Sequence, residues 1–277
     1  MTKLLKTYGI GALTLLVFSL FGCNSDTEDI LQEPDLTIVT DDYLISQAFE
    51  DLDNITLTAL DNSGLGARMT KDISISEICE TAIATLDETG KIITIDFGAG
   101  CTSSNGIARK GKIILSYSGN LIFPGAKVVA TFNGYFVNGK KIEGTRTITN
   151  TGIDFLTSSI SLAVKIENGK ITWPDNTFVT LASDQIRSVK LGNDGYDASI
   201  TGSASGISRD GVNYNTLVID PLIVKQSCVA SGVSVPGAGK LQFQYGGVEV
   251  TVDYGDGSCD KLVTITYPGG SKEVTLD

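Results

Sequence analysis

The chain of 277 residues has no histidine, one tryptophan, two methionines and six prolines. Without histidine it cannot build a Ser-His-Asp or Cys-His nucleophile, or a metal site with a histidine ligand. Basic residues are scarce as well, because 21 lysines and arginines stand against 32 aspartates and glutamates, a net charge of −11. A surface of this charge repels nucleic acid and anionic lipid, so we expect no nucleic-acid partner.

The apolar run near the N-terminus, Ile10–Leu20, is too short for a membrane span. It follows Lys3 and Lys6, an order that is typical of export signals, so we expect residues 1–22 to be a signal peptide. Without these residues, which include both lysines and no acidic residue, 19 basic residues (21 minus 2) and 32 acidic ones remain, a net charge of −13.

The apolar run ends in Leu20-Phe-Gly-Cys23, which resembles a bacterial lipobox. The resemblance implies that Cys23 carries a diacylglyceryl group on its sulfur, becomes the first residue after cleavage and is acylated again on its amine. Two or three acyl chains would hold the protein on a membrane, so we expect an anchored protein that does not span it. The alternative is an ordinary secretory signal with a cysteine near its cleavage site.

The residues after Cys23 bear on the location of the protein. Asn24 stands where an aspartate would mark retention at the inner membrane, which favours the outer membrane. The acidic segment Ser25–Asp29 resembles the surface-export signal of Bacteroidota lipoproteins, which implies the cell surface. The alternative is a solvated tether on the periplasmic face. We expect residues 23–39 to be a flexible tether and residues 40–277 a β-rich domain, with two possible lobes at about 40–152 and 153–277.

Four cysteines follow Cys23, an even number that fits two disulfides in an exported protein. Two of them end a repeated turn, Asp96-Phe-Gly-Ala-Gly-Cys101 and Asp253-Tyr-Gly-Asp-Gly-Ser-Cys259. Three pairings are possible. We favour Cys79–Cys101 and Cys228–Cys259, because each pair would enclose one hairpin that ends in the repeated turn.

One amphipathic helix is predicted just after the tether. Thr40 has the chemistry of an N-cap, and Asp41 and Asp42 would lie in the first helical turn. Apolar residues then recur at helical spacing: Leu44, Ile45, Ala48, Phe49, Leu52 and Ile55. We expect this helix to pack one face on a sheet, either as a plug of the β body or as a lid or partner-binding helix.

From about residue 81 onward, apolar-polar alternation and turn signals predict strands almost to the end of the chain. Residue pairs that favour tight hairpins occur at Asn138-Gly139, Asn168-Gly169, Asp210-Gly211 and Gly246-Gly247. Many long strands cannot lie flat in one sheet. We therefore expect a mainly β fold with long antiparallel strands, in a curved meander or a two-sheet body. The basic residues beside turns, among them Arg109 and Lys110, are interpreted as charges that protect edge strands.

Carboxylates are the groups left for catalysis once the cysteines are assigned to the anchor and the disulfides. We expect no enzymatic activity, because the spacing of the acidic residues selects no catalytic pair. The remaining enzyme alternative is a glycoside hydrolase that uses two carboxylates. Its candidates are Glu77, Glu80, Asp96, Glu143, Asp175, Asp253 and Asp256.

We expect no cofactor, with calcium as the alternative. Asp253, Asp256 and Asp260 lie in one glycine-containing turn, and calcium takes oxygen ligands from loops of this kind. The competing interpretation is that each aspartate accepts hydrogen bonds from nearby backbone amides and so stabilises a tight turn.

Several segments together resemble a group of uncharacterised Bacteroidota lipoproteins. The resemblance rests on the lipobox, Cys79, Ile93–Cys101, Gly106–Gly111, Tyr135–Gly144, Thr201–Gly206 and Asp253–Asp260. It implies an outer-membrane location and a β fold with disulfides, and it assigns no catalytic residue.

Three functions are compatible with these observations. The first is a lipid-anchored, non-enzymatic surface protein that binds an unknown ligand or partner. The second is a periplasm-facing carrier whose curved sheet holds an acyl chain or another apolar ligand. The third is a carbohydrate-binding or calcium-dependent module. A concave face lined continuously by aliphatic residues would favour the carrier, and a packed sandwich would exclude it.

Overall fold

The computed structural model describes residues 33–63, 78–104, 106–192 and 195–276. The expected signal peptide, the lipidation site Cys23 and the carboxylate candidate Glu77 lie outside these residues. Residues Gln32–Asp277 form one compact unit, and the description below concerns that unit.

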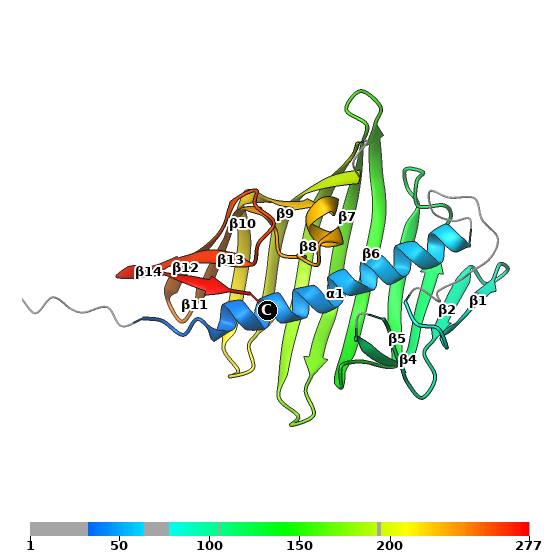
Figure 1. Ribbon diagram of the computed structural model, residues 1–277, viewed down its shortest axis with the longest axis horizontal. Helices are drawn as coiled ribbons and strands as arrows, with labels where there is room; N and C mark the ends of the chain where they lie inside the picture. The colour runs from blue at the N-terminus through cyan, green and yellow to red at the C-terminus, as the bar shows by residue number, and fades with distance from the viewer. Residues whose placement is uncertain (1–32, 64–77, 105, 193–194, 277) are drawn as a thin grey trace, which may run out of the picture. The chain divides into compact units, whose positions relative to one another are not determined.

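One large antiparallel sheet forms the body of this unit and curves around the long helix α1 (Figure 1). Its strands follow the chain in the order β1-β2-β4 and then β5 to β14, while the short β3 pairs with β4. This arrangement confirms the expected mainly β fold, and of the two predicted architectures it is the curved meander. The strands are β1 (Ile83–Asp87), β2 (Ile92–Asp96), β3 (Cys101–Thr102), β4 (Ala108–Tyr117), β5 (Lys127–Val137), β6 (Lys140–Asp154), β7 (Ser159–Thr172), β8 (Phe178–Gly192), β9 (Gly195–Ile207), β10 (Asn213–Lys225), β11 (Ala238–Tyr245), β12 (Val248–Asp256), β13 (Leu262–Tyr267) and β14 (Gly270–Thr275).

Helix α1 (Thr37–Asn62) crosses the strands on the hollow side of the sheet (Figure 1). It begins three residues before the predicted N-cap Thr40, inside the range expected to be a tether. The carboxylate of Asp35 accepts hydrogen bonds from the Thr37 amide (2.9 Å) and hydroxyl (2.7 Å) at this end. Ile38 and Val39 are buried in the core, so packing extends the helix past the local signal at Thr40.

The hairpin predicted at Asn168-Gly169 does not form, because both residues lie within the continuous strand β7. The pairing of β7 with β8 shifts between Ile166 and Gly169, and Asn168 has a φ of 53°. A β-bulge of this kind requires the same positive φ as a tight turn, so the dipeptide signals both. The hairpins at Asn138-Gly139 and Gly246-Gly247 do form, with positive φ at all four residues.

Two disulfides, Cys79–Cys101 and Cys228–Cys259, join the cysteines in the favoured pairing. The first encloses the β1–β2 hairpin, and the second joins the short helix α2 (Gln226–Ala230) to the segment after β12. The repeated turn has the same hydrogen bond in both copies. Asp96 accepts from the Gly98 amide (2.8 Å), and Asp253 accepts from the Gly255 amide (3.0 Å).

The hydrophobic core has two parts, and α1 contributes to both. Phe49, Leu52 and Ile55 pack with residues of β2 and β4 to β8, while Ile38 and Val39 pack with residues of β9 to β14. The possible lobe boundary near residue 152 lies within β6, which pairs with β7 from Lys141 to Asp154.

Candidate functional site

A cavity of about 460 Å³ lies between α1 and the hollow face of the sheet, mainly at β6 to β10. Strand alternation builds its sheet wall, because every second residue of each strand points to the same side. The apolar side chains of that wall are Ile148, Ile160, Leu162, Val164, Ile166, Leu181, Val189, Ala198, Ile200, Ala204, Val218, Leu222, Val224 and Leu241. Aliphatic side chains therefore make up most of the sheet wall, which also carries polar residues: Arg146, Ser183, Gln185, Arg187, Tyr196, Ser203 and Thr216.

The helix wall of the cavity is mostly polar. This wall consists of residues that are three or four positions apart and therefore share one face of the helix. They are Tyr43, Ser46, Gln47, Glu50, Asp53, Asn54 and Leu57. The opposite face of α1, with Ile45, Phe49 and Leu52, is buried in the core. A molecule in this cavity would meet mostly hydrocarbon on the sheet side, interrupted by the polar side chains of that wall, and mostly polar groups on the helix side, which suits an amphiphile.

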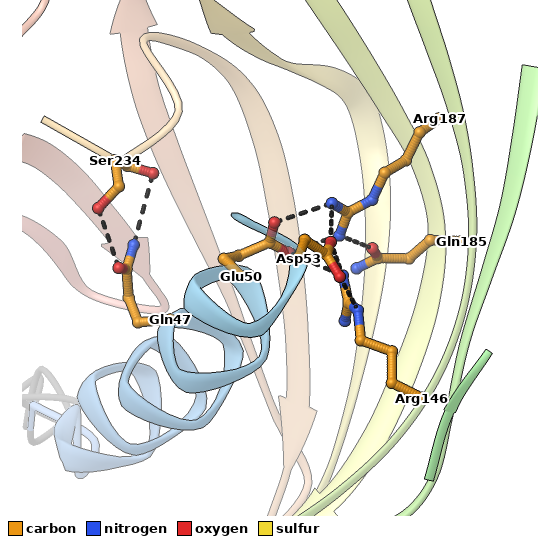
Figure 2. Close-up of polar contacts among 7 residues, drawn as sticks. All are labelled: Gln47, Glu50, Asp53, Arg146, Gln185, Arg187 and Ser234. Atoms are coloured by element: carbon orange, nitrogen blue, oxygen red, sulfur yellow. Dashed lines mark hydrogen bonds and ion pairs between the residues drawn. The ribbon is translucent and has the colours of Figure 1, made fainter. Parts of the chain in front are cut away.

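Two arginines of the sheet bind two carboxylates of α1 inside this cavity (Figure 2). Arg146 of β6 donates hydrogen bonds to both oxygens of Asp53. Arg187 of β8 donates to both oxygens of Glu50, with 2.8 Å from Nη1 to Oε2, and also to Asp53 at 3.2 Å. Arg187 also donates a hydrogen bond to the side-chain oxygen of Gln185 (2.8 Å). We call Glu50, Asp53, Arg146 and Arg187 the cavity ion cluster.

Burial makes this cluster energetically important. The Arg146 side chain is 2% exposed, whereas that of Glu50 is 36% exposed and faces the cavity. Buried charges are tolerated when they are paired, and the cluster is neutral, with two positive and two negative groups. Burial alone would raise the pKa of Glu50, but the guanidiniums of Arg187 and Arg146 hold it at about 2. Burial and the neighbouring charge of Glu50 raise the pKa of Asp53 against the opposing effect of Arg146.

A third arginine, Arg109 of β4, binds α1 further along the helix. It donates to both carboxylate oxygens of Asp51, at 2.8 and 2.7 Å. The interpretation of Arg109 as an edge-strand charge is therefore wrong, because its side chain is buried and β4 lies between β2 and β5. Three arginines from β4, β6 and β8 thus hold one acidic stretch of α1, Glu50–Asp53, against the sheet.

The segment after α2 contacts α1 as well (Figure 2). The Ser234 hydroxyl donates to the Gln47 side-chain oxygen (2.9 Å), and the Gln47 amide donates to the Ser234 carbonyl (3.4 Å). Gln47 and Ser234 both line the cavity. Polar contacts therefore hold α1 to the sheet and to this loop.

Apart from Glu77, which lies outside the described residues, the carboxylates proposed from the sequence are dispersed over the surface and do not line the cavity. Four of them pair with a basic side chain: Asp96 with Lys112, Glu143 with Lys141, Asp175 with Arg209 and Asp253 with Lys240. Glu80 is exposed. Asp256 accepts from the hydroxyl (2.8 Å) and amide (3.3 Å) of Ser258, and Asp260 accepts from the Leu262 amide (3.0 Å).

The calcium candidates thus make the turn-stabilising hydrogen bonds that the competing interpretation describes. Within the described ranges, no three Asp, Glu or Cys side chains gather as a set of metal ligands.

Sequence reasoning did not identify the cavity ion cluster. The sequence did contain a signal for a buried charge. Arg146 is an even number of positions from Ile142 and Ile148 in β6, so its side chain points to the same, inward side of the sheet. A charged residue on the buried face of a strand needs a partner from another element. The acidic run Glu50–Asp53 within the amphipathic helix could have supplied it.

A second hollow, of about 540 Å³, lies on the opposite face of β7 to β10. Polar residues line much of it, including Lys170, Thr180, Ser205, Asn213 and Asn215. It is more open than the cavity beneath α1, and it holds no comparable cluster of charged groups among its lining residues.

In the part of the chain that the structure describes, no helix combines the length and the apolar character needed to cross a membrane. Comparisons with protein-family models, with curated proteins and with solved structures give no match to this chain.

Proposed function

We propose that this protein is a lipid-anchored protein of the cell envelope, without enzymatic activity, that binds an amphiphilic molecule with an acyl chain in the cavity beneath α1. The observation that carries the proposal is the cavity itself, which has a mainly aliphatic wall on the sheet and a mainly polar wall on the helix. Its volume of about 460 Å³ lies within the range of about 300–1,000 Å³ that is typical of small-molecule sites.

The architecture supports this proposal, because the fold is one curved sheet and not a packed sandwich. A second sheet would fill the hollow face with side chains, whereas one helix leaves room beside it. The cavity ion cluster neutralises its own charges, so a ligand with a long hydrocarbon part and a small polar end meets no uncompensated charge on entry.

Binding can be tested on residues 24–277, which contain the whole compact unit and omit the expected anchor. The probe is cis-parinaric acid, a fluorescent fatty acid. We expect saturable binding that Val189→Trp, within the cavity wall, abolishes. The matched control is Ile186→Trp on the outer face of the same strand, β8, which should bind as the unchanged protein does. Absence of binding, or equal loss in both variants, would refute the proposal.

The expected lipid on Cys23 and the acidic segment after it support a position on the outer membrane, facing the exterior. Intact cells can be treated with a protease that does not cross the outer membrane. We expect the protein to be cleaved while a periplasmic control protein survives. If the protein survives in intact cells and is cleaved only in lysate, it faces the periplasm and carries its ligand there.

A further inference from the structure

The tip of the β6–β7 hairpin exposes two large apolar side chains. Phe155 is 85% exposed and Leu156 is 98% exposed. The turn that presents them is well defined, because the Asp154 carboxylate accepts hydrogen bonds from the amides of Leu156 (2.8 Å) and Thr157 (3.3 Å). The hairpin protrudes at the edge of the sheet where β6 ends and β7 begins (Figure 1). Exposed aromatic and aliphatic residues in a fixed turn, at a protruding edge, mark a contact surface.

A second apolar loop lies along the same edge. It connects β4 to β5, and its Phe123 is 61% exposed. Asn150 of β6 fixes this loop, because its side-chain amide donates to the Leu121 carbonyl (3.0 Å) and its own carbonyl accepts from the Gly125 amide (2.7 Å). We call Phe123, Phe155 and Leu156 the apolar rim.

The apolar rim is continuous with the cavity beneath α1. Leu121 and Ile122, which directly precede Phe123, line the cavity. Ile160 lines it as well and pairs across the β6–β7 hairpin with Ile153, next to the exposed tip. An apolar path therefore leads from the cavity wall to the rim.

The two loops of the rim, residues 120–126 and 155–158, include no charged residue, and Lys127 and Asp154 flank them. The one neighbouring acid, Asp154, turns its carboxylate onto backbone amides. A surface that is apolar and uncharged matches the interior and the interface of a lipid bilayer of low surface charge better than it matches a typical polar protein surface.

Chain length also favours a bilayer as the occupant. Cys23 lies ten positions before Glu33, where the described residues begin. At about 3.5 Å per position this stretch extends at most about 35 Å, so the lipid anchor expected on Cys23 would keep the domain close to a membrane.

We propose that the apolar rim inserts into the surface of an uncharged or zwitterionic lipid bilayer and so places the open side of the cavity against it. The purpose of this contact, exchange of an amphiphile with the membrane, rests on the proposed function. Insertion itself does not depend on ligand binding, so the two ideas can fail separately.

The test uses the full chain in phosphatidylcholine vesicles whose acyl chains carry bromine, a quencher of tryptophan fluorescence. Leu156→Trp places a tryptophan on the rim. Ile186→Trp, with 44% exposure at the native residue, places one on the outer face of β8 as the matched control. The native Trp173, which precedes the β7–β8 turn at the opposite edge of the sheet, sets the background in the unchanged protein.

We expect the emission of the Leu156→Trp variant to shift to the blue and to be quenched by the brominated lipid, because a ring buried about 5–10 Å deep lies among the acyl chains. Emission of Ile186→Trp and of the unchanged protein should stay unquenched. Equal quenching in both variants, or none in either, would overturn the proposal. A blue shift without quenching would also overturn it, because it would show that the rim contacts protein, such as a second copy of the chain.

Failure of insertion is separable from failure of ligand binding. Phe155→Ser combined with Leu156→Ser should abolish insertion and leave the affinity of residues 24–277 for cis-parinaric acid unchanged. If this double change weakens ligand binding in solution, the rim belongs to the ligand site and the membrane role is wrong.

Discussion

Arg146 and Asp53, which are 93 positions apart in the chain, form a two-point ion pair that ties the middle of α1 to β6 within the cavity. The pair is one part of the neutral cluster that Arg187 and Glu50 complete. Its geometry gives α1 a defined position on the hollow face of the sheet.

Removal of one partner of this pair should be costly. Arg146→Met leaves the buried carboxylate of Asp53 without its bidentate partner, and we expect a loss of about 3–5 kcal/mol in the free energy of unfolding, measured by urea titration. Removal of both charges, by Arg146→Met with Asp53→Leu, should cost much less because no charge is left buried and unpaired.

An exposed ion pair on the neighbouring strand provides the control. Lys165 and Glu167 of β7 are 3.1 Å apart and about half exposed. Lys165→Met should change stability by less than about 1 kcal/mol. If Arg146→Met costs no more than Lys165→Met, the buried pair does not hold α1 to the sheet.

Glu50 should make stability depend on pH in the acid range. The pKa of Glu50 in the folded protein is about 2, below the ordinary value of 4.5, so its stabilising contribution is present above pH 4.5 and is lost as the pH falls toward 2. Glu50→Gln should therefore lower the urea midpoint at pH 7, with a difference that shrinks below pH 4.5. A constant difference between pH 7 and pH 2.5 would contradict this account.

Asp42 should make stability depend on pH in the opposite direction, with stability lost as the pH rises. Burial raises the pKa of Asp42 from 3.8 to about 6, and a hydrogen bond from Tyr214 only partly opposes this effect. Because the folded protein holds this proton more tightly, the associated stability is present below pH 3.8 and is lost as the pH rises through 6. The difference of about two pKa units corresponds to about 3 kcal/mol.

Asp42→Asn removes this titration. We expect the variant to gain stability relative to the unchanged protein as the pH rises from 4 to 8, in thermal unfolding followed by circular dichroism. Burial raises the pKa of Asp41 as well. The Asp41 carboxylate also accepts a hydrogen bond from the Arg209 amide (2.8 Å), so Asp41→Asn serves as the comparison variant. A pH profile for Asp42→Asn that parallels that of the unchanged protein would contradict the assignment.

The Cys228–Cys259 disulfide should stabilise the fold and the loop that contacts α1. With a sequence separation of 31 between its cysteines, chain-entropy arithmetic gives about 3–4 kcal/mol, which Cys228→Ser with Cys259→Ser would remove. Hydrogen exchange of the segment from α2 to Ser234 should also accelerate, since the bridge holds α2. Unchanged exchange there would show that the bridge does not support the Gln47–Ser234 contact.

Local sequence signals predicted the elements of this fold well where a motif favours a single local structure. Asn138-Gly139 indicated a hairpin and forms one, while Asn168-Gly169 has the same letters and forms a bulge inside β7. The register shift with β8 decides between the two, and that is a property of the assembled sheet. Thr40 failed as a helix start for a similar reason, because Ile38 and Val39 find partners in the core.

The candidate site was less accessible to sequence reasoning than the fold. The curved sheet was expected, and with it a concave face that a carrier would use. The ion cluster joins residues 50, 53, 146 and 187, and nothing in the spacing of these four positions reveals their contact. The calcium candidates Asp253, Asp256 and Asp260 were proposed because they lie in one glycine-containing turn, and in the structure they accept hydrogen bonds within that turn. The exposure of Phe155 and Leu156 at the β6–β7 tip likewise depends on the fold. In the sequence they are ordinary apolar residues, so their exposure could not be predicted from it.

The measurement that tests the central claim most directly is photo-crosslinking of residues 24–277 with a fatty acid that carries a diazirine on its acyl chain, followed by mass spectrometry of the labelled peptides. We predict labels on the inward-facing residues of β7 to β9, among them Leu162, Val189 and Ile200, and their loss when unlabelled fatty acid is added in excess. Labels confined to the outer face or to the exposed β6–β7 tip, or labels that excess fatty acid does not reduce, would contradict a ligand site beneath α1.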